Sequence, residues 1–110
     1  MSRIAYVNGA YQSMADAMVN IEDRGYQFAD GVYEGILVYK GALIDLDPHI
    51  ERLWRSLGEL QMAAPMGKGP LGFVIREVVR RNRVQNGFVY LQITRGVAPR
   101  DHAFPEFSIP

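Results

Sequence analysis

The sequence contains no cysteine among its 110 residues. A disulfide framework, a thiol nucleophile and a thiolate metal site are therefore excluded for this chain. Its 12 basic and 12 acidic residues cancel, so net charge gives no reason to expect nucleic acid or an anionic membrane as a partner. No apolar run reaches the roughly 18 residues that a membrane span needs, and the N-terminus lacks the apolar core of a signal peptide. These absences predict a cytoplasmic protein.

The composition that remains, 48% hydrophobic and 22% charged, is that of a globular domain with one core. Alternating and helical patterns predict strands first, then two helices, then a last strand, which indicates an α+β fold. The expected elements, in order, are a hairpin (4–7 and 10–12), an extended piece (18–21), a second hairpin (32–39 and 42–46), a helix from Asp47, a breaker loop (62–70), a helix (71–82), a strand (88–95) and a terminal loop (96–110).

The first helix has the clearer signals of the two. Asp47 suits the N-cap, where its carboxylate would accept hydrogen bonds from free amides, and Pro48 suits the first helical position. Apolar residues then recur at helical spacing, which predicts a stripe that faces the core. The stripe consists of Ile50, Leu53, Trp54, Leu57 and Leu60.

The rest of the chain is organised around residues 23–39, DRGYQFADGVYEGILVY. Its first half is rich in turn-forming and aromatic residues, and its second half reads as a strand. Tyr33 and Glu34 therefore fall at the start of a strand, where rigid structure can hold side chains toward a cavity. The alternative is a buried loop whose aromatic residues fill the core.

This segment resembles the DRG-aromatic-x-aromatic-GDGVYE segment of class IV (fold type IV) pyridoxal-phosphate aminotransferases, with Ala29 where the family often has glycine. The family includes D-amino acid aminotransferases, branched-chain aminotransferases and aminodeoxychorismate lyases. The resemblance covers nearly the whole chain, but only the N-terminal part of a considerably longer protein. It implies that residues 1–110 form the small N-terminal domain, an antiparallel sheet with two helices packed on one side, and that the C-terminal cofactor-binding domain is absent from this chain.

A second motif, His49-Ile50-Glu51-Arg52-Leu53, resembles the H-x-x-R-L of these aminotransferases. The resemblance implies that Arg52 binds the phosphate of pyridoxal 5'-phosphate, for which a guanidinium fork is chemically suited. His49 is expected to have a structural role. Without the resemblance, the pair reads as a solvated arginine beside a histidine in the capping turn.

A third motif, RGVAPRDHAFP at residues 95–105, resembles the R-G-x-x-P-R-x-H-x-F-P loop of D-amino acid aminotransferases. The resemblance implies that Arg100 and His102 reach across a homodimer to the substrate α-carboxylate, which Tyr33 of the first subunit also contacts. Gly35 stands where relatives often carry a bulkier residue, so a wider side-chain pocket is expected. Without the resemblance, the loop reads as exposed polar surface.

The resemblance also implies what this chain lacks. The lysine that forms the Schiff base and the acid that pairs with the pyridine nitrogen lie downstream in the family, beyond Pro110. Lys40 and Lys68 are the only lysines here, and neither matches a motif. No catalytic residue is therefore expected on the chain, which by itself is predicted to be inactive, and no metal site is indicated.

The predicted function is that of the N-terminal part of an aminotransferase acting on a D-amino acid and a 2-oxo acid, as a homodimer without nucleic-acid or membrane partners. Two alternatives stay open. One keeps the family but changes the reaction to a branched-chain or (R)-amine transaminase or an aminodeoxychorismate lyase. The other is a non-catalytic interaction domain.

Overall fold

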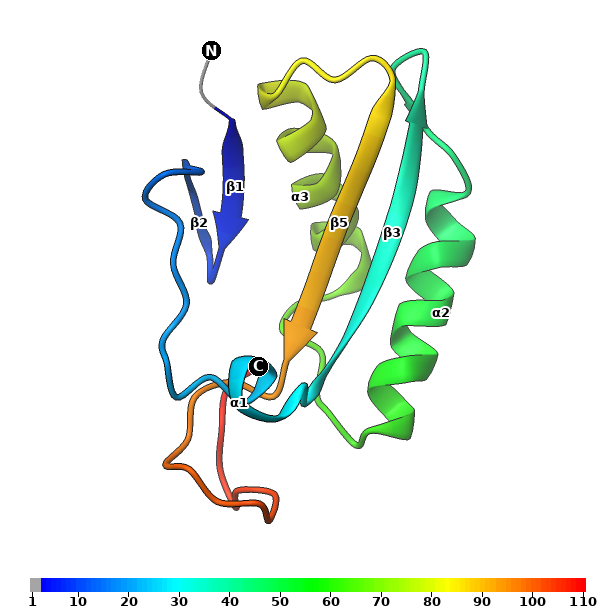
Figure 1. The fold of residues 1–110 in the computed structure, drawn as a ribbon. Coiled ribbons are helices and arrows are strands. Elements are labelled where there is room, and N and C mark those ends of the chain that lie inside the picture. The colour runs from blue at the N-terminus through cyan, green and yellow to red at the C-terminus, as the bar shows by residue number, and fades with distance from the viewer. Residues whose placement is uncertain (1–2) are drawn as a thin grey trace.

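The computed structural model describes residues 3–110, which form two antiparallel sheets and three helices. Strands β1 (Ile4–Val7) and β2 (Ala10–Ser13) make a separate hairpin, and β3 (Gly31–Tyr39) lies between β4 (Ala42–Leu43) and β5 (Gly87–Thr94). The two long helices, α2 (Leu46–Glu59) and α3 (Lys68–Arg81), flank the larger sheet, with α3 behind β5 and α2 beside β3 in Figure 1. The predicted α+β fold, with an antiparallel sheet and two helices on one side, is confirmed.

The alternation of side chains along β3 gives the larger sheet two different faces. β3 and β5 pair in register from Gly31 opposite Thr94 to Val38 opposite Gly87. Successive side chains of a strand point to opposite faces, so the even-numbered residues of β3 face the helices and are buried, whereas the odd-numbered residues from Tyr33 to Tyr39 face solvent or lie partly covered. The even positions hold three aliphatic residues and one acid, Glu34.

The hydrophobic core fills the space between the inner sheet face and the two long helices. Leu53 of α2 and Ile36 of β3 are completely buried at its centre. The apolar stripe predicted for the first helix is confirmed, with Trp54 and Leu60 partly buried at its margin. The other core residues are Val32, Leu46, Ile50, Leu57, Met62, Leu71, Ile75 and Ile93.

The β1–β2 hairpin was predicted correctly around Asn8-Gly9, where both turn residues adopt positive φ angles. It is attached to the end of α3 through Asn82. The backbone amide of Ile4 donates to Asn82 Oδ1 at 2.8 Å, and Asn82 Nδ2 donates to the Ile4 carbonyl at 2.9 Å. This pair of bonds holds the small sheet beside the helical layer.

The chain before β3 differs in two places from what its pattern indicated. The segment 23–31, expected to be rich in turns, contains the short helix α1 (Arg24–Phe28), which the side chain of Asp23 caps and the left-handed Ala29 ends. A helix of five residues is too short to show a periodic pattern. The extended piece expected at 18–21 forms no strand, because no neighbouring strand pairs with it.

The starts of both long helices also differ from prediction. α2 begins at Leu46 rather than after an Asp47 cap, and the preceding Asp45 makes no side-chain capping bond. α3 begins at Lys68, inside the segment expected to be a loop. Pro48 and Pro70 each occupy the third helical position, where the missing amide has no intrahelical partner to lose. Proline therefore marked the first turn of each helix but not its first residue.

Candidate functional site

A buried carboxylate joins β3 to α2 at the edge of the larger sheet. Glu34 occupies an inward position of β3, and His49 and Arg52 stand on the first turns of α2. Arg52 donates from Nε to Glu34 Oε2 and from Nη2 to Oε1, both at 2.8 Å. His49 Nδ1 lies 2.7 Å from the same Oε1. One carboxylate thus holds both residues of the H-x-x-R-L motif.

The guanidinium of Arg52 is bound by Glu34 through two of its nitrogens, and the rest of the group is exposed. Its side chain is 66% exposed, whereas that of Glu34 is 4% exposed. Within residues 3–110, Nη1 of Arg52 has no hydrogen-bond partner, so it and the second Nη2 hydrogen remain available to a ligand. The pKa of Arg52 is raised by the hydrogen bonds to Glu34 and in smaller part by Tyr33. A cation fixed by a buried anion, with free donors in a planar fork, fits the phosphate of a cofactor.

The same contacts lower the pKa of Glu34. The hydrogen bond from Arg52 is the largest cause, and it outweighs burial, which by itself would raise the pKa. The folded chain therefore keeps this carboxylate charged at pH values at which the unfolded chain binds the proton. The resulting stabilisation is complete above the ordinary glutamate pKa of about 4.3 and is lost as the pH falls through the lower folded pKa.

We expect Glu34→Gln to flatten the acid limb of the stability curve. The free energy of unfolding, measured by urea titration from about pH 7 to about pH 3, should fall less steeply for this variant than for the wild type, because the linked proton is gone. Glu106→Gln, which changes an exposed carboxyl of the terminal loop, should leave the slope as it is. Equal slopes for the Glu34 variant and the wild type would contradict the ion pair.

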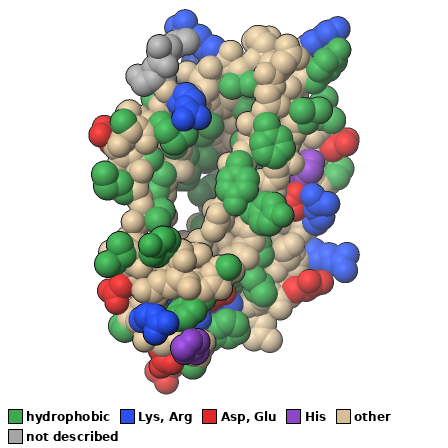
Figure 2. Space-filling view, in the orientation of Figure 1, with side chains coloured by type: hydrophobic (Ala, Val, Ile, Leu, Met, Phe, Trp, Pro, Cys, Tyr) green, Lys and Arg blue, Asp and Glu red, His purple; other side chains and the backbone are tan. Residues whose placement is uncertain are grey.

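The outer face of the larger sheet carries an aromatic surface. Hydrophobic side chains gather over β3 and β5 on the face shown in Figure 2, with charged and histidine side chains at the edge on the α2 side. The rings of Tyr33 and Tyr90 stack across the two strands with centroids 5.7 Å apart. The Tyr33 hydroxyl therefore stands on the solvent-facing side of the sheet, as an exposed donor and acceptor.

Gly35 does not widen this surface. A side chain at position 35 would collide with the ring of Phe88, which lies over the glycine from the neighbouring strand. The expectation of a wider pocket is therefore wrong, because a residue 53 positions later in the chain fills the space. The pairing of β3 with β5 determines which side chain fills the space over Gly35. The local sequence around Gly35 does not reveal that neighbour.

The loop after β5 holds the third motif. Arg100 and His102 are both exposed, and both side chains lie against the ring of Phe28 in α1. Among the described residues, no hydrogen bond, ion pair or aromatic contact joins them to Tyr33 or Arg52. Within one chain, Tyr33 lies on β3 and Arg52 on α2. The loop that follows β5 extends beyond the end of the larger sheet, as Figure 1 shows.

Sequence reasoning assigned no role to Glu34 as an anchor or to the buried cluster of Arg24, Asp30 and Arg95. A signal for Glu34 was present, because an acid at an inward position between Val32 and Ile36 needs a buried partner. The buried cluster had no such signal. Its members come from α1, the turn before β3 and the end of β5, and only the fold brings them together.

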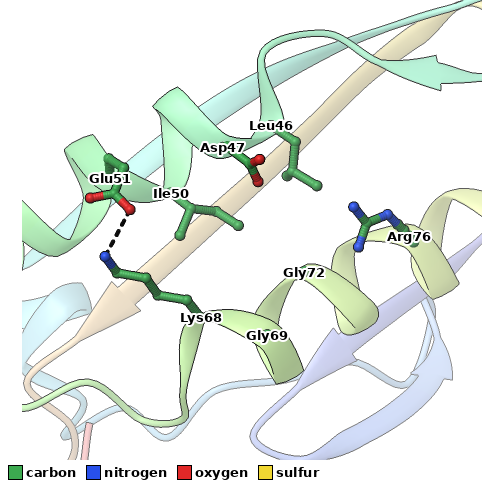
Figure 3. A pocket seen from close by; sticks show the side chains of 8 residues that line it. All are labelled: Leu46, Asp47, Ile50, Glu51, Lys68, Gly69, Gly72 and Arg76. Atoms are coloured by element: carbon green, nitrogen blue, oxygen red, sulfur yellow. Dashed lines mark hydrogen bonds and ion pairs between the residues drawn. The ribbon is translucent and has the colours of Figure 1, made fainter.

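A groove of about 300 Å³ runs between α2 and α3 (Figure 3). The charged residues that line the groove are both acidic and basic, and Lys68 Nζ is already paired with Glu51 Oε1 at 2.8 Å. None of the residues predicted for the site lines it. In the described part of the chain, no three histidine or acidic side chains cluster as metal ligands would.

The helices of residues 3–110 include none with the length and apolarity to cross a membrane.

Comparisons with known proteins identify relatives of this chain. The D-alanine aminotransferase of Staphylococcus haemolyticus is 45% identical over 100 residues, which are 91% of this chain and 36% of the relative. That of Bacillus licheniformis is 44% identical over 97 residues, or 88% of this chain and 34% of the relative. The chain therefore spans about a third of the length of these relatives.

Solved structures show the same fold. The T.th. branched-chain amino acid aminotransferase, complexed with N-(5'-phosphopyridoxyl)-L-glutamate, superposes with a TM-score of 0.82 at 25% identity, over 90% of this chain and 35% of the other. The branched-chain aminotransferase of Thermoproteus uzoniensis with norvaline gives 0.72 at 25% identity, over 84% and 32%. A sequence profile of the family described as Amino-transferase class IV matches residues 31–109. With the carboxylate-anchored arginine and these relatives, that match shows that the chain belongs to the class IV aminotransferase family.

Proposed function

We propose that this chain is the N-terminal small domain of a pyridoxal-phosphate-dependent aminotransferase that moves an amino group between a D-amino acid and a 2-oxo acid. The sequence relatives named above are D-alanine aminotransferases, and the matched residues are 36% and 34% of their lengths. The lysine that bonds the cofactor would then belong to the rest of a longer, cytoplasmic protein. Lys40 and Lys68 do not replace it, because Lys40 lies in an exposed turn and Lys68 pairs with Glu51.

The observation that carries the proposal is the anchored guanidinium of Arg52. Glu34 takes two of its donors and leaves the others exposed, so the cation is oriented before any ligand binds. Preorganised charge binds an anion without first ordering a flexible side chain. Arg52 would hold the cofactor phosphate, with His49 bracing the same carboxylate. When bound, the cofactor supplies an electron sink that makes the α-proton of an amino acid removable.

The substrate carboxylate would be held by residues of two subunits. Tyr33 presents its hydroxyl on the outer sheet face, close enough to Arg52 to influence that residue's pKa. Arg100 and His102 lie apart from it in the same chain, so the proposal requires that those of a second subunit complete the site in a homodimer. A guanidinium with hydroxyl and imidazole donors suits a carboxylate, and holding it fixes which face of the α-carbon meets the base.

A second candidate follows from the fold. The T.th. branched-chain aminotransferase superposes on 90% of this chain, so a branched-chain or another reaction of the family is the alternative to D-amino acid transfer. The sequence identity favours the D-specific proposal, at 45% against 25%. A non-catalytic interaction domain is the alternative from a different class.

Substrate preference tests the proposal. The full-length protein loaded with pyridoxal phosphate should transaminate D-alanine with 2-oxoglutarate and should act poorly on L-leucine and on aromatic amines. The 110-residue chain given the same cofactor serves as the control and should form no borohydride-reducible adduct, because its lysines are not placed for one. A preference for L-leucine would overturn the D-specific assignment, and absence of any turnover would favour the interaction domain.

A further inference from the structure

Three charged side chains form a buried cluster where α1, β3 and β5 meet. Arg24 and Arg95 both donate from Nε to Oδ2 of Asp30, at 2.7 Å and 2.8 Å. The exposed fraction of the side chain is only 3% for Arg24, 9% for Arg95 and 7% for Asp30. The pKa of Asp30 is lowered, since burial alone would raise it and the hydrogen bonds from Arg95 and Arg24 prevail.

The remaining donors of the two arginines go to backbone carbonyls of other segments. Arg95 donates from Nη2 to the carbonyl of Leu60 at 2.8 Å, just beyond the end of α2. Arg24 donates from Nη1 to the carbonyl of Asp101 at 2.6 Å, and its Nη2 lies 3.5 Å from the carbonyl of His102. The cluster thus connects the ends of three elements with the loop that follows β5.

The charges of the cluster explain why the loop docks there. Two guanidinium groups against one carboxylate leave one buried positive charge in excess, and an uncompensated buried charge is costly. The loop supplies carbonyl oxygens and the ring of Phe104, whose centroid lies 3.9 Å from Cζ of Arg95 and 5.9 Å from Cζ of Arg24. Aromatic faces and carbonyl dipoles both stabilise cations. The loop therefore stabilises the excess positive charge of the cluster with neutral dipoles and an aromatic face.

We propose that Arg24 is a positioning residue that sets the conformation of the loop 97–105 and thereby the placement of Arg100 and His102. Its guanidinium holds the carbonyls of residues 101 and 102, which directly follow Arg100 and include His102 itself. A side chain on an otherwise exposed loop is placed only as well as its backbone is held. The role in substrate binding rests on the function proposed above, whereas the docking of the loop does not.

Arg24→Lys in the full-length protein tests this role. Lysine keeps the positive charge beside Asp30, but its single ammonium cannot reach Asp30 and both loop carbonyls in the geometry of a guanidinium fork. We expect amide hydrogen exchange in the peptide 97–105 to quicken about tenfold, as for the loss of one charge-assisted hydrogen bond. The KM for D-alanine should rise by about the same factor, with kcat changed much less. The control is Arg83→Lys, at an exposed arginine after α3.

The outcomes separate positioning from general destabilisation. A merely structural role would lower the amount of active enzyme and hence the apparent kcat, with KM and loop exchange unchanged, and that result would overturn the proposal. If Arg24→Lys does not fold, Arg24→Gln leaves Asp30 paired with Arg95 while removing the guanidinium from the loop carbonyls, and it should also quicken exchange in the loop. Unchanged exchange in that variant would equally overturn it. Faster loop exchange in a protein without transaminase activity would support the positioning role and refute the proposed function.

Discussion

Arg52→Lys is expected to weaken the binding of pyridoxal phosphate to the full-length protein by about 10- to 100-fold, the effect of losing one charge-assisted hydrogen bond. The guanidinium of Arg52 donates hydrogen bonds to Glu34 from two nitrogens and has further N–H donors available for a ligand. A lysine ammonium is a single point of charge, so it would be drawn to the buried carboxylate and would leave the phosphate without its fork. Titration of the apoprotein with cofactor, followed by absorbance, measures the dissociation constant.

The matched control lies one turn further along α2. Arg55 is 79% exposed, and its only side-chain partner within residues 3–110 is Glu59, so Arg55→Lys should bind the cofactor as the wild type does. Both substitutions change arginine to lysine on the same helix, and only one touches the carboxylate at the sheet edge. Equal affinities for the two variants would show that Arg52 does not hold the phosphate.

Leu53→Ala is expected to lower the free energy of unfolding by about 2–5 kcal/mol. Leu53 is completely buried between α2 and the inner sheet face, so truncation removes apolar contacts and leaves a cavity in a close-packed layer. Urea denaturation of the 110-residue chain, followed by the fluorescence of Trp54 at the core margin, reports the change.

Leu37→Ala provides the comparison, because Leu37 stands on the outer face of β3 and is 53% exposed. A substitution there should change the stability of the chain by no more than about 0.5 kcal/mol. Similar costs for the two variants would mean that the described packing of α2 on the sheet is wrong. The pair therefore tests which face of β3 is buried.

Much of the fold was predictable because its signals are local. The turn at Asn8-Gly9, the strand at 32–39 and the helical stripe of α2 each depend on residues close together in the chain, and each was confirmed. The failures concern helix ends and short elements. α1 is only five residues long, and Pro48 and Pro70 were compatible with several positions in a first turn.

The candidate site divides in the same way. Motif resemblance named Tyr33, Arg52, Arg100 and His102, and their roles stay predictions for the experiments above. It did not reveal that Arg52 is anchored by Glu34, 18 residues earlier, or that Phe88 covers Gly35. Both relations depend on which residues strand pairing and helix packing bring together.

By itself, the sequence determined the family, the α+β class and the inward faces of the long helices, because these follow from motifs and from repeating patterns of apolar residues. Only the tertiary structure decided how the charged groups are paired. Asp30 meets Arg95 across 65 positions of the chain, and Arg24 reaches the Asp101 carbonyl across 77. A buried ion must find its partner in space, and neighbours in space that are distant in sequence are created only when the sheet and helices pack.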